Sequence, residues 1–228
     1  MAYTQTTLLA RVRDVMDATS SARWSDAVLL DYADIVFDAE WTGLLDVAPT
    51  LRAAERTVTT DSNGQVAWTS LNSGSGDTAQ TFYKVLAVND GTQLYTPISF
   101  QDVPLATRTS SYVSQFDKRY YPIGEAFQFL PSASGQTLYV TVSHTPTRPG
   151  SLAGGSSTVT FPDPYGPLLS WGTAALALQK GGAEYDTSVV LQAQADKLRQ
   201  QMYADYARKT AVPSVMQFPD RAWEWGSR

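Results

Sequence analysis

The sequence has 228 residues, a net charge of −5 and no cysteine. The length allows one large domain or two small ones. The acidic balance argues against a surface that grips nucleic-acid phosphates, and the lack of cysteine excludes disulfides, thiolate nucleophiles and cysteine-based metal sites. Charged residues make up only 17%, below the usual quarter, so we expect an uncharged polar surface of the kind that often contacts other protein. No stretch approaches eighteen consecutive apolar residues, which argues against a membrane-spanning helix.

The first 50 residues predict a helical hairpin. Its short first helix shows apolar residues at three- and four-residue spacing, namely Leu8, Leu9, Val12, Val15 and Met16. After a break at residues 18–22, Ser25 is a favourable N-cap for a longer helix that Pro49 ends. That helix carries two adjacent apolar stripes, so we expect it to be largely buried. The first stripe is Leu30, Ala33, Phe37, Trp41 and Leu44, and the second is Val28, Tyr32, Ile35 and Ala39.

From Arg56 onward the apolar pattern changes to a period of two, which predicts strands. Turn signals recur at Asn63-Gly64, at residues 89–91 and at residues 132–135. Three hairpins in about ninety residues favour a small sheet, a sandwich or a barrel. A short helix is possible within residues 101–111.

Residues 146–167 are rich in Pro, Gly and Ser and predict a loop, with a short extended piece at residues 158–161. Loops of that length are typically functional or mobile. Two more helices follow, the first starting near Pro167 and the second covering about residues 184–208.

The sequence therefore predicts an α+β fold. N- and C-terminal helical hairpins pack as a bundle, an antiparallel β-rich region of about three hairpins is inserted between them, and an extended arm ends the chain. The expected parts are residues 1–50, the first half of the bundle; 51–164, the β-rich insertion and loop; 165–209, the second half; and 210–228, the arm.

Recognisable catalytic, cofactor-binding or metal-binding motifs are missing from the sequence. His144 is the single histidine, no G-x-S-x-G motif accompanies it, and we expect it at a strand end on the surface or at an interface. Neither a phosphate-binding loop nor a dinucleotide fingerprint is present. We therefore predict no enzyme activity and no cofactor. A carboxylate hydrolase leaves little sequence trace, but it needs two acids that face each other across a cleft.

Asp31, Asp34 and Asp38 share one face of the second helix. They could form a divalent-cation site, a stripe that meets a basic partner, or a wall that repels phosphate. They could equally be the solvated face of a buried helix.

The last residues combine tryptophan and arginine, the residue types that dominate interaction hot spots. The predicted partner-binding residues are Val215, Met216, Phe218, Arg221, Trp223, Trp225 and Arg228. Pro213 and Pro219 keep this arm extended, and we expect it to dock on another chain.

Three blocks of the sequence resemble one family, the head–tail adaptor proteins of tailed bacteriophages, also called connector or head-completion proteins. The first block is RVRDVMDATSSARWSDAVLLDYADIVFDAEW, the second RYYPIGEAFQFLPSASGQTLYVTVSHTP, and the third DPYGPLLSWGTAALALQKGGAEYDTSVVLQAQADKLRQQM. Their order and spacing carry the resemblance. Residues 56–100 do not match well.

The resemblance implies a structural virion protein, made in the host cytoplasm and located in the neck. Such proteins form a homo-oligomeric ring, typically dodecameric, below the portal, and they extend the DNA channel without binding DNA specifically. A tail or stopper protein binds the far side, and the C-terminal arm reaches into the portal ring. A different hypothesis from the residues alone is a carbohydrate- or receptor-binding β module on a helical stalk. That hypothesis requires Trp68, Tyr83, Tyr95 and Tyr139 to line one open groove.

Overall fold

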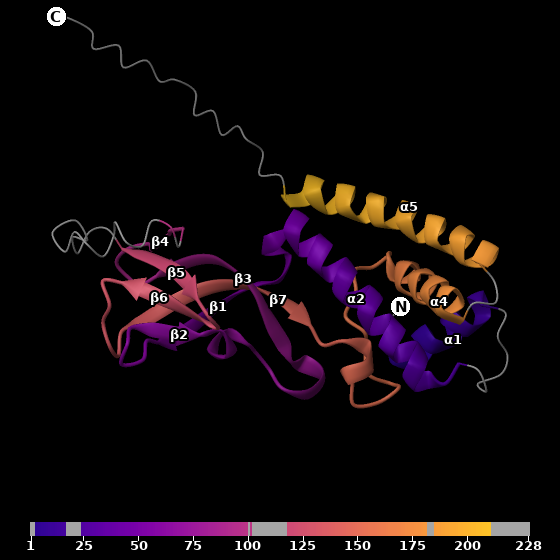
Figure 1. Ribbon diagram of the computed structural model, residues 1–228, viewed down its shortest axis with the longest axis horizontal. Helices are drawn as coiled ribbons and strands as arrows, with labels where there is room; N and C mark the ends of the chain where they lie inside the picture. The colour runs from indigo at the N-terminus through magenta and orange to yellow at the C-terminus, as the bar shows by residue number, and fades with distance from the viewer. Residues whose placement is uncertain (1–2, 17–23, 100, 102–117, 182–184, 211–228) are drawn as a thin grey trace, which may run out of the picture.

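A computed structural model describes residues 3–16, 24–99, 101, 118–181 and 185–210. This part of the chain contains four α-helices and two β-sheets, so the predicted α+β class is confirmed. The helices gather at one end of an elongated molecule and the sheets at the other (Figure 1). The helices are α1 (Gln5–Val15), α2 (Asp26–Val47), α4 (Gly166–Gly181) and α5 (Tyr185–Thr210). Within the described ranges, no helix combines the length and the apolar character needed to cross a bilayer.

The helices begin where the sequence places capping residues. The Thr4 side chain accepts a hydrogen bond from the Thr7 amide at the start of α1. The Ser25 side chain accepts one from the Val28 amide at the start of α2, which confirms the predicted N-cap. Pro167 lies in the first turn of α4, where its missing N–H leaves no helical hydrogen bond unmade.

The four helices enclose one hydrophobic core. Its fully buried members include Leu8 of α1, Phe37 and Leu44 of α2, Leu168 of α4 and Met202 of α5. Helix α2 also approaches α4 closely at one glycine. A Cβ atom added at Gly172 would lie 2.9 Å from Val36 Cγ1, so a larger side chain there would separate the two helices.

The loop between the last strand and α4 packs on the helices. Its residues Leu152 and Val159 belong to the helical core, and Phe161 packs against Phe37 and Trp41. The Val159 amide donates to the Tyr3 carbonyl at 2.7 Å. Although the sequence groups this loop with the β region, its side chains complete the helical core.

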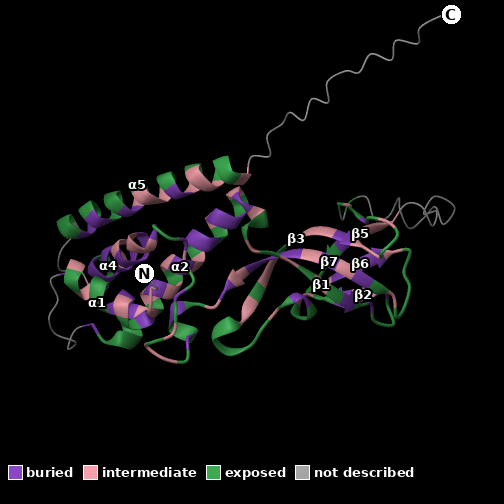
Figure 2. Ribbon diagram, turned by 180° about the vertical axis from the view of Figure 1, so that it is seen from behind, coloured by how far each residue is buried: buried purple, intermediate pink, exposed green. Residues whose placement is uncertain are grey.

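In the described residues, seven strands form two sheets. The strands are β1 (Ala53–Thr59), β2 (Gln65–Ala67), β3 (Gln80–Asn89), β4 (Thr96–Pro97), β5 (Arg119–Ile123), β6 (Ala126–Leu130) and β7 (Thr137–Pro146). One sheet has the order β1-β7-β3 and the other the order β2-β6-β5-β4. Short 3₁₀ helices are η1 (Pro49–Arg52), η2 (Trp68–Leu71), η3 (Gly76–Thr78) and η5 (Pro149–Ser151). Inner side chains of both sheets, among them Val58, Val88, Phe129 and Val140, share a second core (Figure 2).

Two of the three predicted hairpins are wrong as strand pairings, and the one at residues 89–91 is reduced to a single antiparallel bridge. At Asn63-Gly64 the chain does turn, but β1 pairs with β7 and β2 with β6. At residues 89–91 a single bridge joins Asn89 to Leu94, and β4 then pairs in parallel with β5. At residues 132–135 the chain passes from β6 to β7, which lie in different sheets. Turn residues set where the chain reverses, whereas burial of an apolar face sets which strands pair.

The described strands contain one antiparallel hairpin between consecutive strands, formed by β5 and β6. Its turn includes Gly124, which has a positive φ of 57°. Apart from Gln101, the predicted short helix within residues 101–111 lies outside the described residues. The same holds for the predicted arm at residues 210–228, apart from Thr210.

Candidate interaction surfaces

The acidic stripe on α2 is partly used to hold the loop of residues 147–165. Arg148 forms an ion pair with Asp38 at 2.7 Å, and the Gly150 amide donates to Asp34 at 2.7 Å. Burial raises the pKa of Asp34, and the Gly150 amide and Arg148 partly oppose that rise. Asp31 is exposed and has no hydrogen-bond or ion-pair partner among the described residues. Of the three predicted residues, Asp31 alone presents a free carboxylate to other molecules.

The carboxylates of the described chain do not form a metal site. Groups of three or more His, Cys, Asp or Glu side chains placed to hold a cation are not found among the described residues. The two carboxylates that face the loop are occupied by an arginine and a backbone amide. The geometry of the acidic stripe therefore does not support a divalent-cation site.

A buried ion pair that the sequence did not indicate joins α2 to α5. The Glu40 side chain is 1% exposed and accepts hydrogen bonds from Arg199 Nε at 2.7 Å and from Arg199 Nη2 at 2.5 Å. The Tyr203 hydroxyl lies 3.4 Å from the same carboxylate, and Asp196 also pairs with Arg199. Burial, followed by the Glu40 charge, raises the pKa of Tyr203 to about 12. Glu40 and Arg199 are 159 residues apart in sequence, so no local signal could have paired them.

A second polar contact joins the helices to the sheets. The Tyr83 hydroxyl on β3 donates to Asp46 near the end of α2 at 2.7 Å. Burial and this hydrogen bond raise the pKa of Tyr83 to about 12. The end of α5 is held at the same place, because the Thr210 hydroxyl lies 3.5 Å from the Val47 carbonyl.

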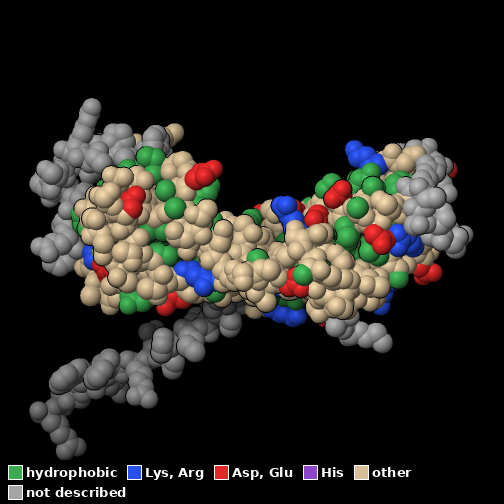
Figure 3. All heavy atoms as spheres, turned by 90° about the horizontal axis from the view of Figure 1, so that it is seen from below, with side chains coloured by type: hydrophobic (Ala, Val, Ile, Leu, Met, Phe, Trp, Pro, Cys, Tyr) green, Lys and Arg blue, Asp and Glu red, His purple; other side chains and the backbone are tan. Residues whose placement is uncertain are grey.

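The outer face of α2 is more exposed than the sequence predicted. Ile35 is 58% exposed, Val28 is 36% exposed, and Ala39 is also exposed. Three of the four residues in the second apolar stripe of α2 are therefore exposed, because α4, α5 and the loop cover the other sides of the helix. The fourth, Tyr32, is half-buried and packs against the helical core. On α5, Val189 and Val190 are 49% and 57% exposed. Figure 3 shows the face opposite to α5, where acidic and basic side chains lie scattered among uncharged surface.

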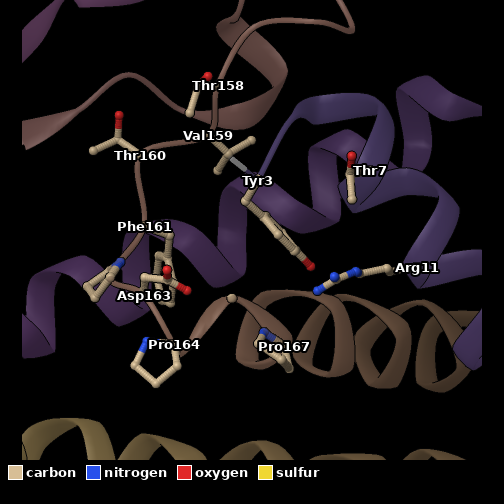
Figure 4. A pocket seen from close by; sticks show the side chains of 12 residues that line it. Tyr3, Thr7, Arg11, Thr158, Val159, Thr160, Phe161, Asp163, Pro164 and Pro167 are labelled. Carbon is tan, nitrogen blue, oxygen red and sulfur yellow. The ribbon is translucent and has the colours of Figure 1, made fainter. Parts of the chain in front are cut away.

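A groove lies between α1, residues 158–164 and the start of α4. It encloses about 550 Å³ and is walled by Tyr3, Arg11, Phe161 and three prolines (Figure 4). The Arg11 guanidinium lies 5.0 Å from the centre of the Tyr3 ring. Asp163 is the one carboxylate among the lining residues. The groove therefore lacks the facing pair of acids that glycoside hydrolysis requires.

His144 is buried, contrary to the predicted surface or interface position. Its side chain is fully inaccessible, and its Nε2 atom lies 2.8 Å from the Leu71 carbonyl. Burial lowers the pKa of His144. His144 lies on β7 opposite Phe82 of β3. The sequence predicted a strand end at the surface here, but neighbouring elements cover this position. The pattern of alternating residues could not show that cover.

The four aromatic residues of the β region do not line one groove. Tyr95 is buried in the β core, Trp68 packs against that core, and Tyr83 packs against the helical core. Tyr139 is half-buried on β7. Among the four, Tyr95 contacts a described pocket, and that pocket is lined mainly by polar residues.

The predicted docking arm begins at the end of α5. Its residues, Val215, Met216, Phe218, Arg221, Trp223, Trp225 and Arg228, all lie outside the described part of the chain. The end of α5 at Thr210 fixes where the arm begins, beside the end of α2.

Comparison with known proteins does not assign a family. No family model matches the chain, and no curated protein matches it either.

Proposed function

We propose that this chain is a structural virion protein, a head–tail adaptor of a tailed bacteriophage. In this proposal it assembles as a homo-oligomeric ring below the portal, extends the DNA channel, and joins the head to a tail or stopper protein. The helical hairpins form a bundle that builds the ring, the β region projects toward a neighbour, and the arm docks on the portal. No cofactor and no catalytic step is involved.

The observation that carries the proposal is how the polar side chains are used. The candidate chemistry of the chain is engaged internally: Glu40 with Arg199, Asp38 with Arg148, and His144 against a backbone carbonyl. What the described chain offers to other molecules is exposed helix surface with apolar side chains, such as Ile35 and Val190. Such a surface suits contact with protein.

The passage of DNA is consistent with the charge. The net charge of −5 favours a surface along which DNA slides without adhering. The proposal therefore includes no specific DNA binding.

The carbohydrate-binding alternative is disfavoured by the aromatic residues. A sugar-binding groove needs exposed rings on one open surface, whereas Tyr95 is buried and Trp68 packs into the β core. A stalk with a receptor-binding tip has no described groove of that kind to use.

The arm provides the first test. Removal of residues 214–228 should abolish binding to the portal protein, because the predicted hot-spot residues are lost. The thermal unfolding midpoint should stay unchanged, since the arm lies beyond α5. Portal binding that survives the deletion would contradict the docking role. A control in which Trp223 and Trp225 are both changed to Ala should weaken binding without shortening the chain.

A further inference from the structure

Two helix faces each combine exposed apolar side chains with one unpaired charge, and the two charges have opposite sign. The α2 strip consists of Val28, Asp31, Ile35 and Ala39, and the α5 strip of Val189, Val190, Ala193 and Lys197. All eight residues are exposed. Neither Asp31 nor Lys197 has an ion-pair partner among the described residues. Figure 2 shows exposed residues along the outer side of α5.

The two strips cannot satisfy each other within one chain. Helices α2 and α5 run in the same direction where they touch, with Arg199 beside Glu40 and Thr210 beside Val47. Lys197 therefore lies level with residue 38, which is about 10 Å along the helix axis from Asp31 at 1.5 Å per residue. The contacts between α2 and α5 also use other faces, because Arg199 and Tyr203 point inward while Lys197 is exposed.

We propose that the α2 strip of one copy packs against the α5 strip of a second copy, with the two helices antiparallel and Asp31 opposite Lys197. This inference rests on the proposed ring and names the surfaces that join neighbouring subunits. The occupant of each strip is a second copy of this chain because the two strips are complementary in charge and in apolar character.

The antiparallel direction follows from the residues that face each other once Asp31 is placed opposite Lys197. With Asp31 opposite Lys197, antiparallel helices place Ile35 over the small Ala193 and Ala39 beside Val189. Parallel helices would instead place Ile35 over Gln201. The antiparallel register matches two of the three apolar residues of the α2 strip with apolar residues, and Val28 lies opposite Gln200. The parallel register would place all three opposite polar residues. The antiparallel register also lets the large Ile35 fill the space above an alanine.

The two strips are different surfaces, so the contact is head-to-tail. A contact of this kind leaves one strip free on each end subunit and continues until the assembly closes into a ring or grows as a filament. The ion pair fixes the register and the apolar residues supply the buried area. The geometry thus gives the proposed ring a specific interface.

Charge reversal tests the contact in the full-length chain. Asp31→Lys and Lys197→Asp should each weaken self-association by about tenfold or more, because each places like charges opposite one another. The two changes combined should restore association to within about threefold of the unchanged protein. The control Lys180→Asp reverses an exposed lysine at the end of α4, outside both strips, and should have little effect. Sedimentation velocity over a concentration series gives the association constants.

A steric pair on the same helix gives an independent reading. Ala193→Trp should block assembly because Ala193 lies under Ile35 in the proposed register. Ala207→Trp should not, because the register places residue 207 opposite residue 21, beyond the start of α2 at Asp26. Both alanines are exposed, so neither change should disturb the monomer.

Engineered cysteines report the contact directly, because the natural chain has none. Asp31→Cys combined with Lys197→Cys should give a ladder of disulfide-linked oligomers under oxidising conditions, and either change alone should not give a ladder. Normal assembly with unaffected charge-reversal variants and no ladder would overturn this interface while leaving the proposed ring intact. An unchanged protein that stays monomeric even with the portal protein would overturn both proposals.

Discussion

Loss of Arg199 should destabilise the protein more than loss of its partner Glu40. Arg199→Met leaves the Glu40 carboxylate buried, at 1% exposed, with the Tyr203 hydroxyl at 3.4 Å as its remaining described partner. Removing one partner of a buried ion pair typically costs about 3–5 kcal/mol, since an uncompensated charge stays inside. Because Tyr203 supplies one hydrogen bond, we expect about 3 kcal/mol for Arg199→Met.

Glu40→Gln leaves a different situation. The Arg199 side chain is 31% exposed and keeps its ion pair with Asp196, and a glutamine oxygen can still accept a hydrogen bond from it. The expected cost is about 1.5–2 kcal/mol, at the low end of the range for a hydrogen bond to a charged group. Which of the two variants loses more stability therefore depends on which charge is left buried. It does not depend on the distance between Arg199 and Glu40.

Urea unfolding followed by tryptophan fluorescence measures both free energies, and thermal unfolding should show the same order. At roughly 2–4 °C per kcal/mol for a chain of this size, Arg199→Met should lower the midpoint by roughly 6–12 °C. The double variant Glu40→Gln with Arg199→Met should be more stable than Arg199→Met alone, because the charge that stays unpaired, on Asp196, is 45% exposed and none is left buried. A double variant less stable than Arg199→Met, or a larger loss for Glu40→Gln, would refute the reasoning.

Three further predictions concern other contacts. Folding raises the pKa of Tyr83 to about 12, above its ordinary value near 10. The contribution of Tyr83 to stability is therefore complete below pH 10 and is lost as the pH rises toward 12. Tyr83→Phe should make the unfolding free energy fall less steeply across that pH range. Asp34→Ala should cost about 1–2 kcal/mol and speed amide exchange at Gly150, whereas Asp34→Asn, which keeps an acceptor, should do less. Gly172→Val should cost about 1–3 kcal/mol in urea unfolding, because its Cβ would meet Val36 at 2.9 Å; an unchanged midpoint would show that the helices can separate freely.

The local features of the fold could be predicted from the sequence because they depend on neighbouring residues. Ser25 caps α2 through the Val28 amide, three residues away. The turn at Asn63-Gly64 forms through Gly64, whose φ is 74°. These interactions close within a few residues, so propensity and spacing reveal them.

The strand partners and the internal ion pairs could not be predicted, since they depend on distant residues. Strand β1 pairs with β7, so Val58 lies opposite Leu138. The residues around Val58 give no local signal for that partner, because short β-forming segments occur several times along the chain. Asp38 pairs with Arg148, which lies 110 residues later in the sequence, so local spacing does not show that its carboxylate is occupied.

Exposure of Ile35 shows a related limit. Its spacing placed it on a second apolar stripe of α2, and the sequence therefore indicated burial. In the described chain it is 58% exposed. An apolar stripe indicates a surface that can be buried. It does not show whether the residues that bury it belong to the same chain or to another.

The central claim is that copies of this chain assemble into a ring that binds the portal protein. Native mass spectrometry of the full-length chain, alone and mixed with the portal protein, tests it most directly. The proposal predicts one closed assembly of about twelve copies, matched by ring-shaped particles in electron micrographs. A chain that remains monomeric and unbound in the presence of the portal protein would contradict it.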